Sequence, residues 1–445
     1  MPAAVRLGGD FRGGGYDRDL LLPLVPDPGN PAHVPLVFRD FVARYGFGLG
    51  LQQSQTTEPA SELTRAAAAY GLTGPGAFTS FGADTPRYVT DETGADLGLL
   101  VEPASATNVI ADSADYGTAN WGNQACGRAA DAGAPNPIGG AATWAVFPNT
   151  TNTSHFLNQS FGARSTASGQ HTFSFVVRPK GGQKRMRLHL ISSDWATDTR
   201  ADYDVVAGAV LSTSPGADSA DVEPLGGGWH RLILRATPIA TAGARTIRLQ
   251  FLSDAGASVY AGPGADGANF AHAQMEVGGV ATSPIVTTTG SVTRPADVFD
   301  VAPPVTWGGE GALLVNVPPG SRALDMPLRL QIGGTSSDSV AISRNSTDDG
   351  WRFDYRAGGV LIAGQNLADA TTGYVPGTAA RLATSWSGTT VNSSVNGYAT
   401  PGVASSAVPS GFDRLRCGVV GPVVLDRVAA WRTLFSTAEL AGLTS

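Results

Sequence analysis

Short alternating segments, separated by clusters of turn formers, constrain this chain more than any other feature. Within each segment apolar or small residues alternate with polar ones, which is the period of a strand with one buried face. Clusters of Gly, Pro, Ser, Asp and Asn interrupt the alternation at intervals typical of jelly rolls. The expected strands include residues 143–147, 154–161, 170–178, 186–192, 229–236, 245–252 and 269–276. The pattern predicts an all-β fold.

The amino-acid composition is typical of short strands separated by turns. The chain has 57 Gly and 29 Pro residues, and only 15% of its 445 residues are charged. A hydrophobic content of 42% argues against disorder. The length exceeds what a single core usually supports, so two or three domains are expected.

The charge distribution argues against nucleic-acid binding. The net charge is −7, and the longest basic run is Lys184-Arg185-Met186-Arg187, which we interpret as a solvated strand face. No apolar run approaches the ~18 residues needed to span a bilayer, so membrane insertion is not expected. The Met1-Pro2-Ala3-Ala4 start lacks a signal-peptide pattern, which predicts folding in a reducing cytoplasm. Cys126 and Cys417 lie far apart, so a disulfide framework is not expected.

The region before residue 98 differs from the rest of the chain. Leucines 20–22 are followed by four prolines within nine residues, which predicts a mostly irregular segment. One helix is predicted where Glu58 and Pro59 run into the alanines 66–69, with Gly71 as its stop. The apolar residues of this region form no evident core, so we expect partners to bury them.

Residues 273–297 predict an interdomain connector. The segment Ala273–Val277 alternates as a strand does, and Gly278-Gly279 interrupts it. Ser283-Pro284, threonines 287–289 and Thr293-Arg294-Pro295 then favour extended and turn conformations.

The last third of the chain contains a strand-and-hairpin pattern of its own. Residues 379–386 alternate, and the strand predicted from Val391 ends at an Asn396-Gly397 hairpin turn. Ser436 with Glu439 three residues later predicts a capping box that opens a short terminal helix.

Several of these motifs resemble bacteriophage virion proteins. The resemblance rests on Pro86-Arg87, on "GLL-x-E-x-A-x-TN" at residues 98–108, and on "AQ-x-E-x-G, ATS-x-I, TR-x-AD" at residues 273–297. The G-x-GW-x-R element at residues 226–231 and the Y-x-G-x-G turn at residues 260–264 add to it. Ser105 departs from the pattern, which has a shorter spacing there. The resemblance implies a jelly roll similar to carbohydrate-binding modules.

The C-terminal motifs resemble concanavalin A-like, laminin-G-type domains. The matching motifs are "R-x-A-x-x-W" followed by "VNG", and the closing Leu434–Leu440 stretch, which is similar to "LS-x-AEL". We therefore predict a particle-attachment or oligomerisation region at 1–97, a jelly roll at 98–297 and a concanavalin A-like domain at 298–445.

The resemblance implies a tail fibre, head spike or decoration protein of a tailed phage or gene transfer agent. Such a protein would adsorb to cell-surface polysaccharide, with its N-terminal region bound to other virion proteins. A homo-oligomer is expected, with a trimer favoured and a pentamer as the alternative. A chain truncated to begin near Asp84 should fold yet fail to join the particle. The competing hypotheses are a glycan depolymerase and a purely structural spacer.

Catalytic motifs are not evident, so a non-enzymatic role is expected. The six histidines lack metal-ligand spacing, and there is no G-x-S-x-G, phosphate loop or C-x-x-C. Paired carboxylates for glycoside hydrolysis are harder to exclude, because such pairs come from distant residues. Solvated loops explain most of the acidic pairs, with a structural Ca²⁺ as the alternative and no other cofactor expected. These pairs are Asp348-Asp349, Asp194 with Asp198, Asp202 with Asp204, and Asp218 with Asp221.

Aromatic residues are the candidate carbohydrate-binding groups, because sugar rings stack their apolar faces on Trp or Tyr. Trp195 lies in a polar loop, where a large aromatic is unexpected, and Trp121 is in a similar position. Trp351 and Tyr355 share one face of an expected strand. For all four residues the alternative is burial in a core or an interface, and for Trp229 and Trp386 core packing is favoured.

Overall fold

A computed structural model provides the structure of the chain. It describes residues 36–38, 61–140, 143–161, 169–191, 194–196, 198–239, 245–301, 309–319, 326–331, 338–345, 350–388, 390–404, 412, 414–420, 423–425, 427–431 and 434–445. The described residues form an almost entirely β structure with two short helices, so the predicted all-β class is confirmed. No helix among them is long and apolar enough to cross a membrane.

The first sandwich packs two six-stranded antiparallel sheets. One sheet, here called the β12 sheet, has the order β16 (Ser219–Gly226), β17 (Trp229–Ala236), β12 (His171–Lys180), β19 (Gly267–Val277), β10 (Thr143–Pro148) and β9 (Cys126–Asp131). The other, here called the β13 sheet, has the order β15 (Ala209–Thr213), β14 (Thr199–Asp204), β13 (Arg185–Ile191), β18 (Arg245–Leu252), β11 (His155–Phe161) and β8 (Gly122–Gln124).

The strand order of this sandwich is that of a jelly roll. From β10 to β13, and again from β17 to β19, consecutive strands alternate between the two sheets. The order β10-β19-β12-β17 therefore faces the order β11-β18-β13-β14, which is the double Greek-key arrangement. All seven strands predicted in this region are confirmed to within two residues.

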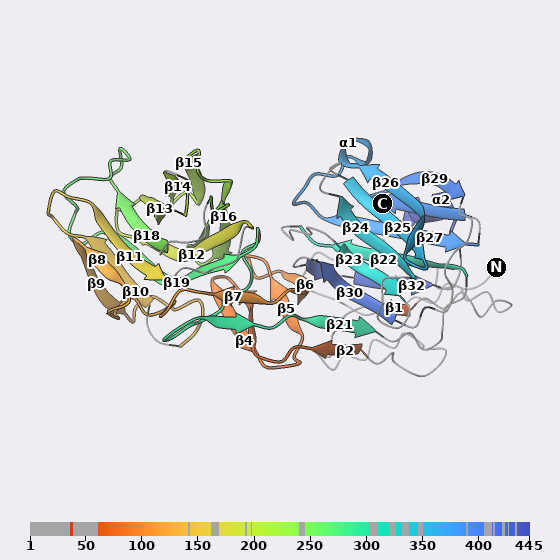
Figure 1. Ribbon diagram of the computed structural model, residues 1–445, viewed down its shortest axis with the longest axis horizontal. Coiled ribbons are helices and arrows are strands. Elements are labelled where there is room, and N and C mark those ends of the chain that lie inside the picture. The colour runs from red at the N-terminus through yellow and green to blue at the C-terminus, as the bar shows by residue number, and fades with distance from the viewer. Residues whose placement is uncertain are drawn as a thin grey trace, which may run out of the picture.

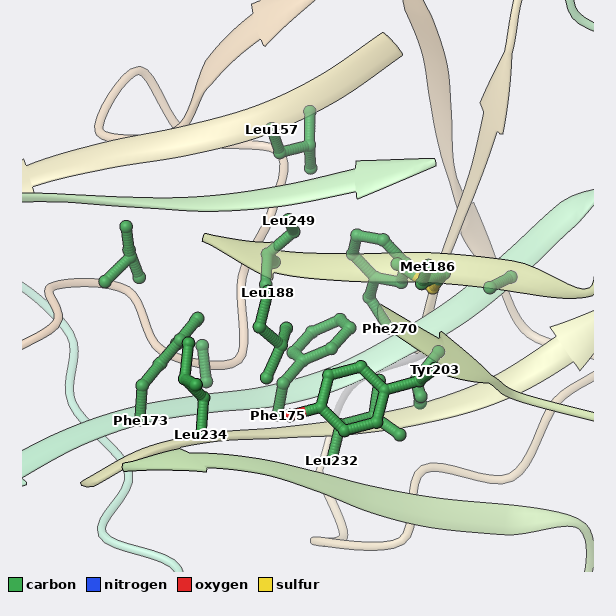
Figure 2. Close-up of a cluster of buried hydrophobic side chains, with 14 of the residues drawn as sticks. Leu157, Phe173, Phe175, Met186, Leu188, Tyr203, Leu232, Leu234, Leu249 and Phe270 are labelled. Atoms are coloured by element: carbon green, nitrogen blue, oxygen red, sulfur yellow. The ribbon is translucent and has the colours of Figure 1, made fainter. Parts of the chain in front are cut away.

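Apolar residues at every second position of these strands fill the space between the sheets (Figure 2). Leu188 and Leu249 come from the β13 sheet, and Phe175 and Phe270 come from the β12 sheet. Phe175 and Phe270 meet edge to face, with ring centroids 4.6 Å apart. Each of these four side chains is fully buried.

The second sandwich contains a six-stranded and a seven-stranded antiparallel sheet. The six-stranded sheet has the order β1 (Leu36–Phe38), β32 (Arg427–Trp431), β22 (Gly311–Val317), β27 (Ala380–Ser387), β28 (Thr390–Val395) and β29 (Tyr398–Ala404). The seven-stranded sheet has the order β2 (Ser61–Thr64), β21 (Val298–Val301), β30 (Arg414–Val420), β23 (Met326–Gln331), β24 (Ser339–Asn345), β25 (Gly350–Ala357) and β26 (Val360–Ala368).

Two local predictions for this sandwich are confirmed. Asn396 and Gly397 both have positive φ, as a two-residue hairpin turn between β28 and β29 requires. Helix α2 (Thr437–Thr444) opens with the predicted capping box of Ser436 and Glu439. Its Leu440 and Leu443 pack on Leu314 and neighbouring residues of the six-stranded sheet. The other helix, α1 (Asp369–Thr372), is a single turn after β26.

Short strands from before residue 109 join the two sandwiches, which Figure 1 shows at opposite ends of the long axis. Strand β5 (Arg87–Thr90) pairs with β6 (Asp96–Val101), and β6 pairs with β31 (Val423–Leu425) of the C-terminal region. Strand β7 (Ala106–Asn108) pairs with β20 (Val292–Arg294) of the connector. The hairpin of β3 (Ala69–Gly74) and β4 (Ala77–Phe81) packs against the jelly roll.

The strand pairing crosses the boundaries predicted at residues 97 and 297. Strands β1 and β2 both lie before residue 98, yet each forms the edge of a sheet in the second sandwich. The helix predicted at residues 58–71 is wrong, because β2 and β3 occupy its described part. The predictions for leucines 20–22 and for Asp348-Asp349 lie outside the described residues.

Candidate functional site

The two loop tryptophans proposed as ligand-binding groups are buried in the jelly roll. Trp195 is 2% exposed; its ring lies edge to face with His171, at 5.5 Å, and beneath the guanidinium of Arg245, at 5.2 Å. Trp121 is 1% exposed, and its indole N–H donates to the carbonyl of Asp112 at 3.0 Å. The predicted exposure of both rings is therefore wrong.

The two strand aromatics are buried in the second sandwich. Trp351 and Tyr355 share one face of β25, as predicted, but that face belongs to the core and both side chains are fully buried. Trp351 contacts Tyr374 edge to face at 5.7 Å, and the Tyr355 hydroxyl hydrogen-bonds Thr384. The core-packing alternative holds for all four residues, so none of them offers a ring face to a ligand.

The motifs that carry the virion resemblance meet at the junction of the sandwiches. Six residues lie together there and are here called the junction network. They are Arg65, Arg87 of β5, Glu102 after β6, Ser283 of the connector, and Arg294 and Asp297 near the end of the connector. All six are at least 92% buried. The sequence did not indicate this convergence, since the residues come from four separate segments.

Arginine side chains, the Ser283 hydroxyl and main-chain N–H groups engage both carboxylates of this network. The Arg87 guanidinium binds both carboxylates, contacting Glu102 at 2.5 Å and also Asp297. The Ser283 hydroxyl and N–H donate to Glu102 at 2.6 and 2.8 Å. Burial alone would raise the pKa of Glu102, but the charges of Arg294 and Arg87 and these hydrogen bonds lower it to about 2. A buried, internally paired cluster of this kind fixes geometry and offers no free group to a substrate.

The outer side of the β12 sheet is also covered. Trp229, which was predicted to be core, is 1% exposed, although it lies outside the sandwich interior. It packs with Leu225 and Val176 beneath Leu72 and Phe78 of the β3–β4 hairpin. Gly226 lies beside this contact with φ of 82°, and a Cβ there would stand 2.1 Å from a main-chain oxygen of Glu92. The G-x-GW-x-R motif therefore forms part of the surface on which this hairpin packs against the jelly roll.

The outer side of the β13 sheet has a different character. On β13 the residues Met186, Leu188 and Leu190 point into the core, so Arg187 and His189 point outward. The same alternation turns polar or aromatic side chains outward from β11, β14 and β18. The outward group, here called the polar sheet face, comprises Phe156, Asn158, Arg187, His189, Arg200, Asp202, Arg248 and Gln250.

Strand register places these side chains in two adjacent rows. One row runs Asn158, Arg248, His189 and Arg200 across four neighbouring strands. The next row runs Phe156, Gln250, Arg187 and Asp202 across the same strands. Directly opposite residues in an antiparallel sheet are about 5 Å apart, so the first row is a continuous strip of hydrogen-bonding groups, and the second is one from Gln250 to Asp202 with the ring of Phe156 at its end.

The arginines of this face are held in different ways. Arg187 forms a two-point contact with Asp202, at 2.6 and 2.9 Å, and Arg200 contacts Asp198 at 2.9 Å. Arg248 instead lies over the ring of Phe156, with its guanidinium carbon 3.9 Å from the ring centroid. No ion pair is formed by Arg248 within the described part of the chain.

Two buried nitrogen atoms of this face have no partner among the described residues. Arg248 Nε and His189 Nδ1 make no hydrogen bond with any described residue. Burial lowers the pKa of Arg248, and it lowers the pKa of His189 to about 4, with the charges of Arg248, Arg187 and Arg200 adding to that shift. Neutral His189 can donate or accept one hydrogen bond at Nδ1, according to its tautomer.

The acidic residues weighed as catalytic or calcium-binding pairs are engaged elsewhere. Asp194 pairs with Arg245 at 3.0 Å, Asp202 with Arg187, and Asp221 with Arg235. Asp218 accepts hydrogen bonds from Gln170 and Thr237. Within the described ranges, no three His, Cys, Asp or Glu side chains are grouped as a metal site would require. The chemistry available at the polar sheet face is therefore hydrogen bonding and charge.

Comparison with known proteins identifies no family. No protein-family model matches the sequence, and no curated protein matches it. Solved structures with similar folds include the CBM40 of a Ruminococcus gnavus sialidase bound to α2,3-sialyllactose, at 14% identity and a TM-score of 0.27, covering 31% of this chain and 84% of that one.

Two further structures match over longer stretches. Domains LG4-5 of mouse laminin α1 are 11% identical with a TM-score of 0.22, covering 63% of this chain and 85% of that one. A CBM22 tandem from Paenibacillus barcinonensis Xyn10C is 10% identical with a TM-score of 0.24, covering 75% of this chain and 100% of that one. At these TM-scores the structural similarity carries no information about ligands.

Proposed function

We propose that this chain is a non-enzymatic virion surface protein that binds cell-surface polysaccharide through the polar sheet face. The observation that carries the binding proposal is the pair of neighbouring strips on the β13 sheet, where donors and acceptors from four strands lie side by side and two nitrogen atoms lack a partner among the described residues. Sugar hydroxyls require such closely spaced polar groups. The virion placement rests on the sequence resemblance.

The asymmetry of the jelly roll supports this choice of face. Its other sheet is covered on the outside by the β3–β4 hairpin and by the connector, where His272 hydrogen-bonds the carbonyl of Ile285 at 3.2 Å. The polar sheet face instead retains partly exposed Asn158, Arg200 and Phe156. Of the two sheets, the β13 sheet is the better surface for a ligand.

The remaining parts of the proposal concern assembly. The N-terminal region would attach the protein to other virion proteins in a homo-oligomer, with a trimer favoured over a pentamer. A depolymerase would need a carboxylic acid free to transfer a proton. On the polar sheet face Asp202 and its neighbour Asp198 are both bound by arginines, which favours binding over hydrolysis.

The test is binding of the purified full chain to a panel of neutral and acidic polysaccharides, with product release followed in parallel. The variant Asn158→Ala should lower affinity severalfold, because it removes an amide from one strip without opening the core. The matched control Thr79→Ala lies on the β3–β4 hairpin and should bind as the wild type does. No binding to any glycan would favour the spacer, and release of oligosaccharides would favour the depolymerase.

A further inference from the structure

We infer that the ligand of the polar sheet face carries an anionic group, a carboxylate or a sulfate on a sugar, which is bound by Arg248 and its neighbour His189. The inference rests on the proposed glycan binding and names the class of glycan.

The first step is the charge balance of the face. Arg187 and Arg200 each have a carboxylate partner, so the charges of those two pairs cancel. Arg248 lies between them and Asn158 with no carboxylate partner in the described structure. A partly buried guanidinium without a counter-ion is unfavourable, because burial removes water that the protein has not replaced. An anion from the ligand would supply the missing charge.

The second step is geometry. Arg248 of β18 is the direct cross-strand neighbour of His189 on β13, so their side chains leave the sheet side by side. Arg248 Nε and His189 Nδ1 are buried and make no hydrogen bond with a described group, so a ligand would meet these half-buried side chains at the Nη atoms of Arg248 and at Nε2 of His189. A carboxylate or sulfate has several oxygens on one atom and can accept from a guanidinium and an imidazole N–H at once.

The third step is the orientation of the guanidinium. The ring of Phe156 lies beneath the Arg248 guanidinium at 3.9 Å and so restricts the tilt of that plane. Less side-chain freedom is then lost when an anion binds, which favours affinity.

The fourth step is the balance of donors and acceptors. The amides of Asn158 and Gln250 supply acceptors as well as donors, but Arg248, which has no carboxylate partner in the described structure, supplies donors alone, and the acidic oxygens of this face are already bound by arginines. A neutral sugar needs acceptors as well as donors, because each hydroxyl donates a proton. The surplus of donors therefore favours an anionic sugar over a neutral one.

The test compares charged and neutral forms of the same glycans. The probes are hexagalacturonate and hyaluronan hexasaccharide with their methyl esters, chondroitin sulfate hexasaccharide, and the neutral cellohexaose. The full chain should bind at least one acidic probe tenfold or more tightly than its neutral counterpart. Preference for chondroitin sulfate over hyaluronan would identify a sulfate, and loss of affinity on esterification would identify a carboxylate.

Variants assign the effect to Arg248. Arg248→Gln should remove the preference for the acidic probe, and Arg248→Lys should restore part of it by keeping the charge without the two-point geometry. The matched control is Lys180→Gln, which removes one charge from the opposite sheet of the same sandwich. Thermal unfolding of each variant checks that the fold is retained.

The outcomes separate this inference from the function on which it rests. Equal binding of acidic and neutral probes, or an unchanged preference in Arg248→Gln, overturns the anionic ligand but leaves glycan binding in place. Equal losses in Arg248→Gln and Lys180→Gln would show unspecific attraction and also overturn it. Failure to bind any probe overturns both.

Discussion

At the scale of single residues, Trp195 shows how a polar sequence can surround a buried ring. Its neighbour Asp194 is 1% exposed and pairs with Arg245, whose guanidinium lies over the indole. Asp194 thus points inward to an ion pair. Sequence alone could not distinguish that arrangement from a solvated loop, because Arg245 lies on a distant strand.

The first prediction follows from this burial. Trp195→Ala should lower the free energy of unfolding by about 3–5 kcal/mol, the usual cost of deleting a buried aromatic ring. Chemical denaturation measures the change, with Val206→Ala as a control at a side chain that is 54% exposed. A variant of unchanged stability that had lost glycan binding would contradict the burial and return Trp195 to the binding site.

The second prediction concerns the pH dependence of stability. The pKa of His189 falls to about 4 in the folded chain and that of His272 to about 3, because burial disfavours the charged ring. Between those values and ~6.5, the ordinary pKa of histidine, the unfolded chain binds protons that the folded chain does not. Stability should therefore decrease as the pH falls from about 7 toward 4.

Denaturation of the wild type and of His189→Gln across this pH range is the measurement. The variant lacks one of these two histidines, so its stability should depend less steeply on pH. A steeper pH dependence of stability in the variant, or no pH dependence in the wild type, would show that the histidine rings are charged in the folded chain.

At the scale of elements, the junction network binds segments that the sequence separates. The third prediction is that Glu102→Gln, which keeps the shape of the side chain, lowers stability by about 3–5 kcal/mol, because Arg87 and Arg294 remain buried with one counter-ion fewer. The control Asp131→Asn breaks the exposed pair with Lys180 and should cost at most about 1 kcal/mol. Equal effects in denaturation would contradict a special role for the network.

Local sequence patterns predicted the individual strands better than they predicted how the strands pair with one another. Alternation located β17 and β18 to the residue, because one buried face dictates the period. The helix prediction at residues 58–71 failed because tertiary contacts override helix propensity there: Leu63 pairs with Phe299, and the Arg65 side chain reaches Asp297 at 3.2 Å.

Only part of the polar sheet face could be predicted from the sequence. Arg185 and Arg187 were expected on a solvated strand face; both point outward from β13, but Arg187 is buried beside Asp202. The same alternation continues to His189. The neighbours Arg248 and Asn158 are set by strand order, which depends on contacts between distant segments. Local periodicity does not specify those contacts.

At the scale of the whole molecule, the described strands before residue 98 contact both sandwiches. The fourth prediction therefore revises the expectation for a chain that begins near Asp84. Such a chain loses β2 and Arg65 from the second sandwich, and it uncovers Trp229 of the first by losing Leu72 and Phe78. It should aggregate or unfold at lower temperature, whereas a chain that begins at residue 60 should fold.

Thermal unfolding and limited proteolysis of the two truncated chains provide the comparison. Equal melting temperatures would show that the early strands are dispensable, as the sequence had suggested. Whether the shorter chain joins a particle remains a separate prediction.

The pairing of β6 with β31 also bears on the order in which the chain can fold during synthesis. Val101 and its neighbours leave the ribosome long before Val423, their partner, has been made. The jelly roll strands β8–β19 lie between them and can pair as soon as they emerge. Strand β6 can pair with β5 at once, but its other edge must stay unpaired until the last residues arrive. This waiting period is when chaperones would be most needed, and slower translation of the final third would lengthen it.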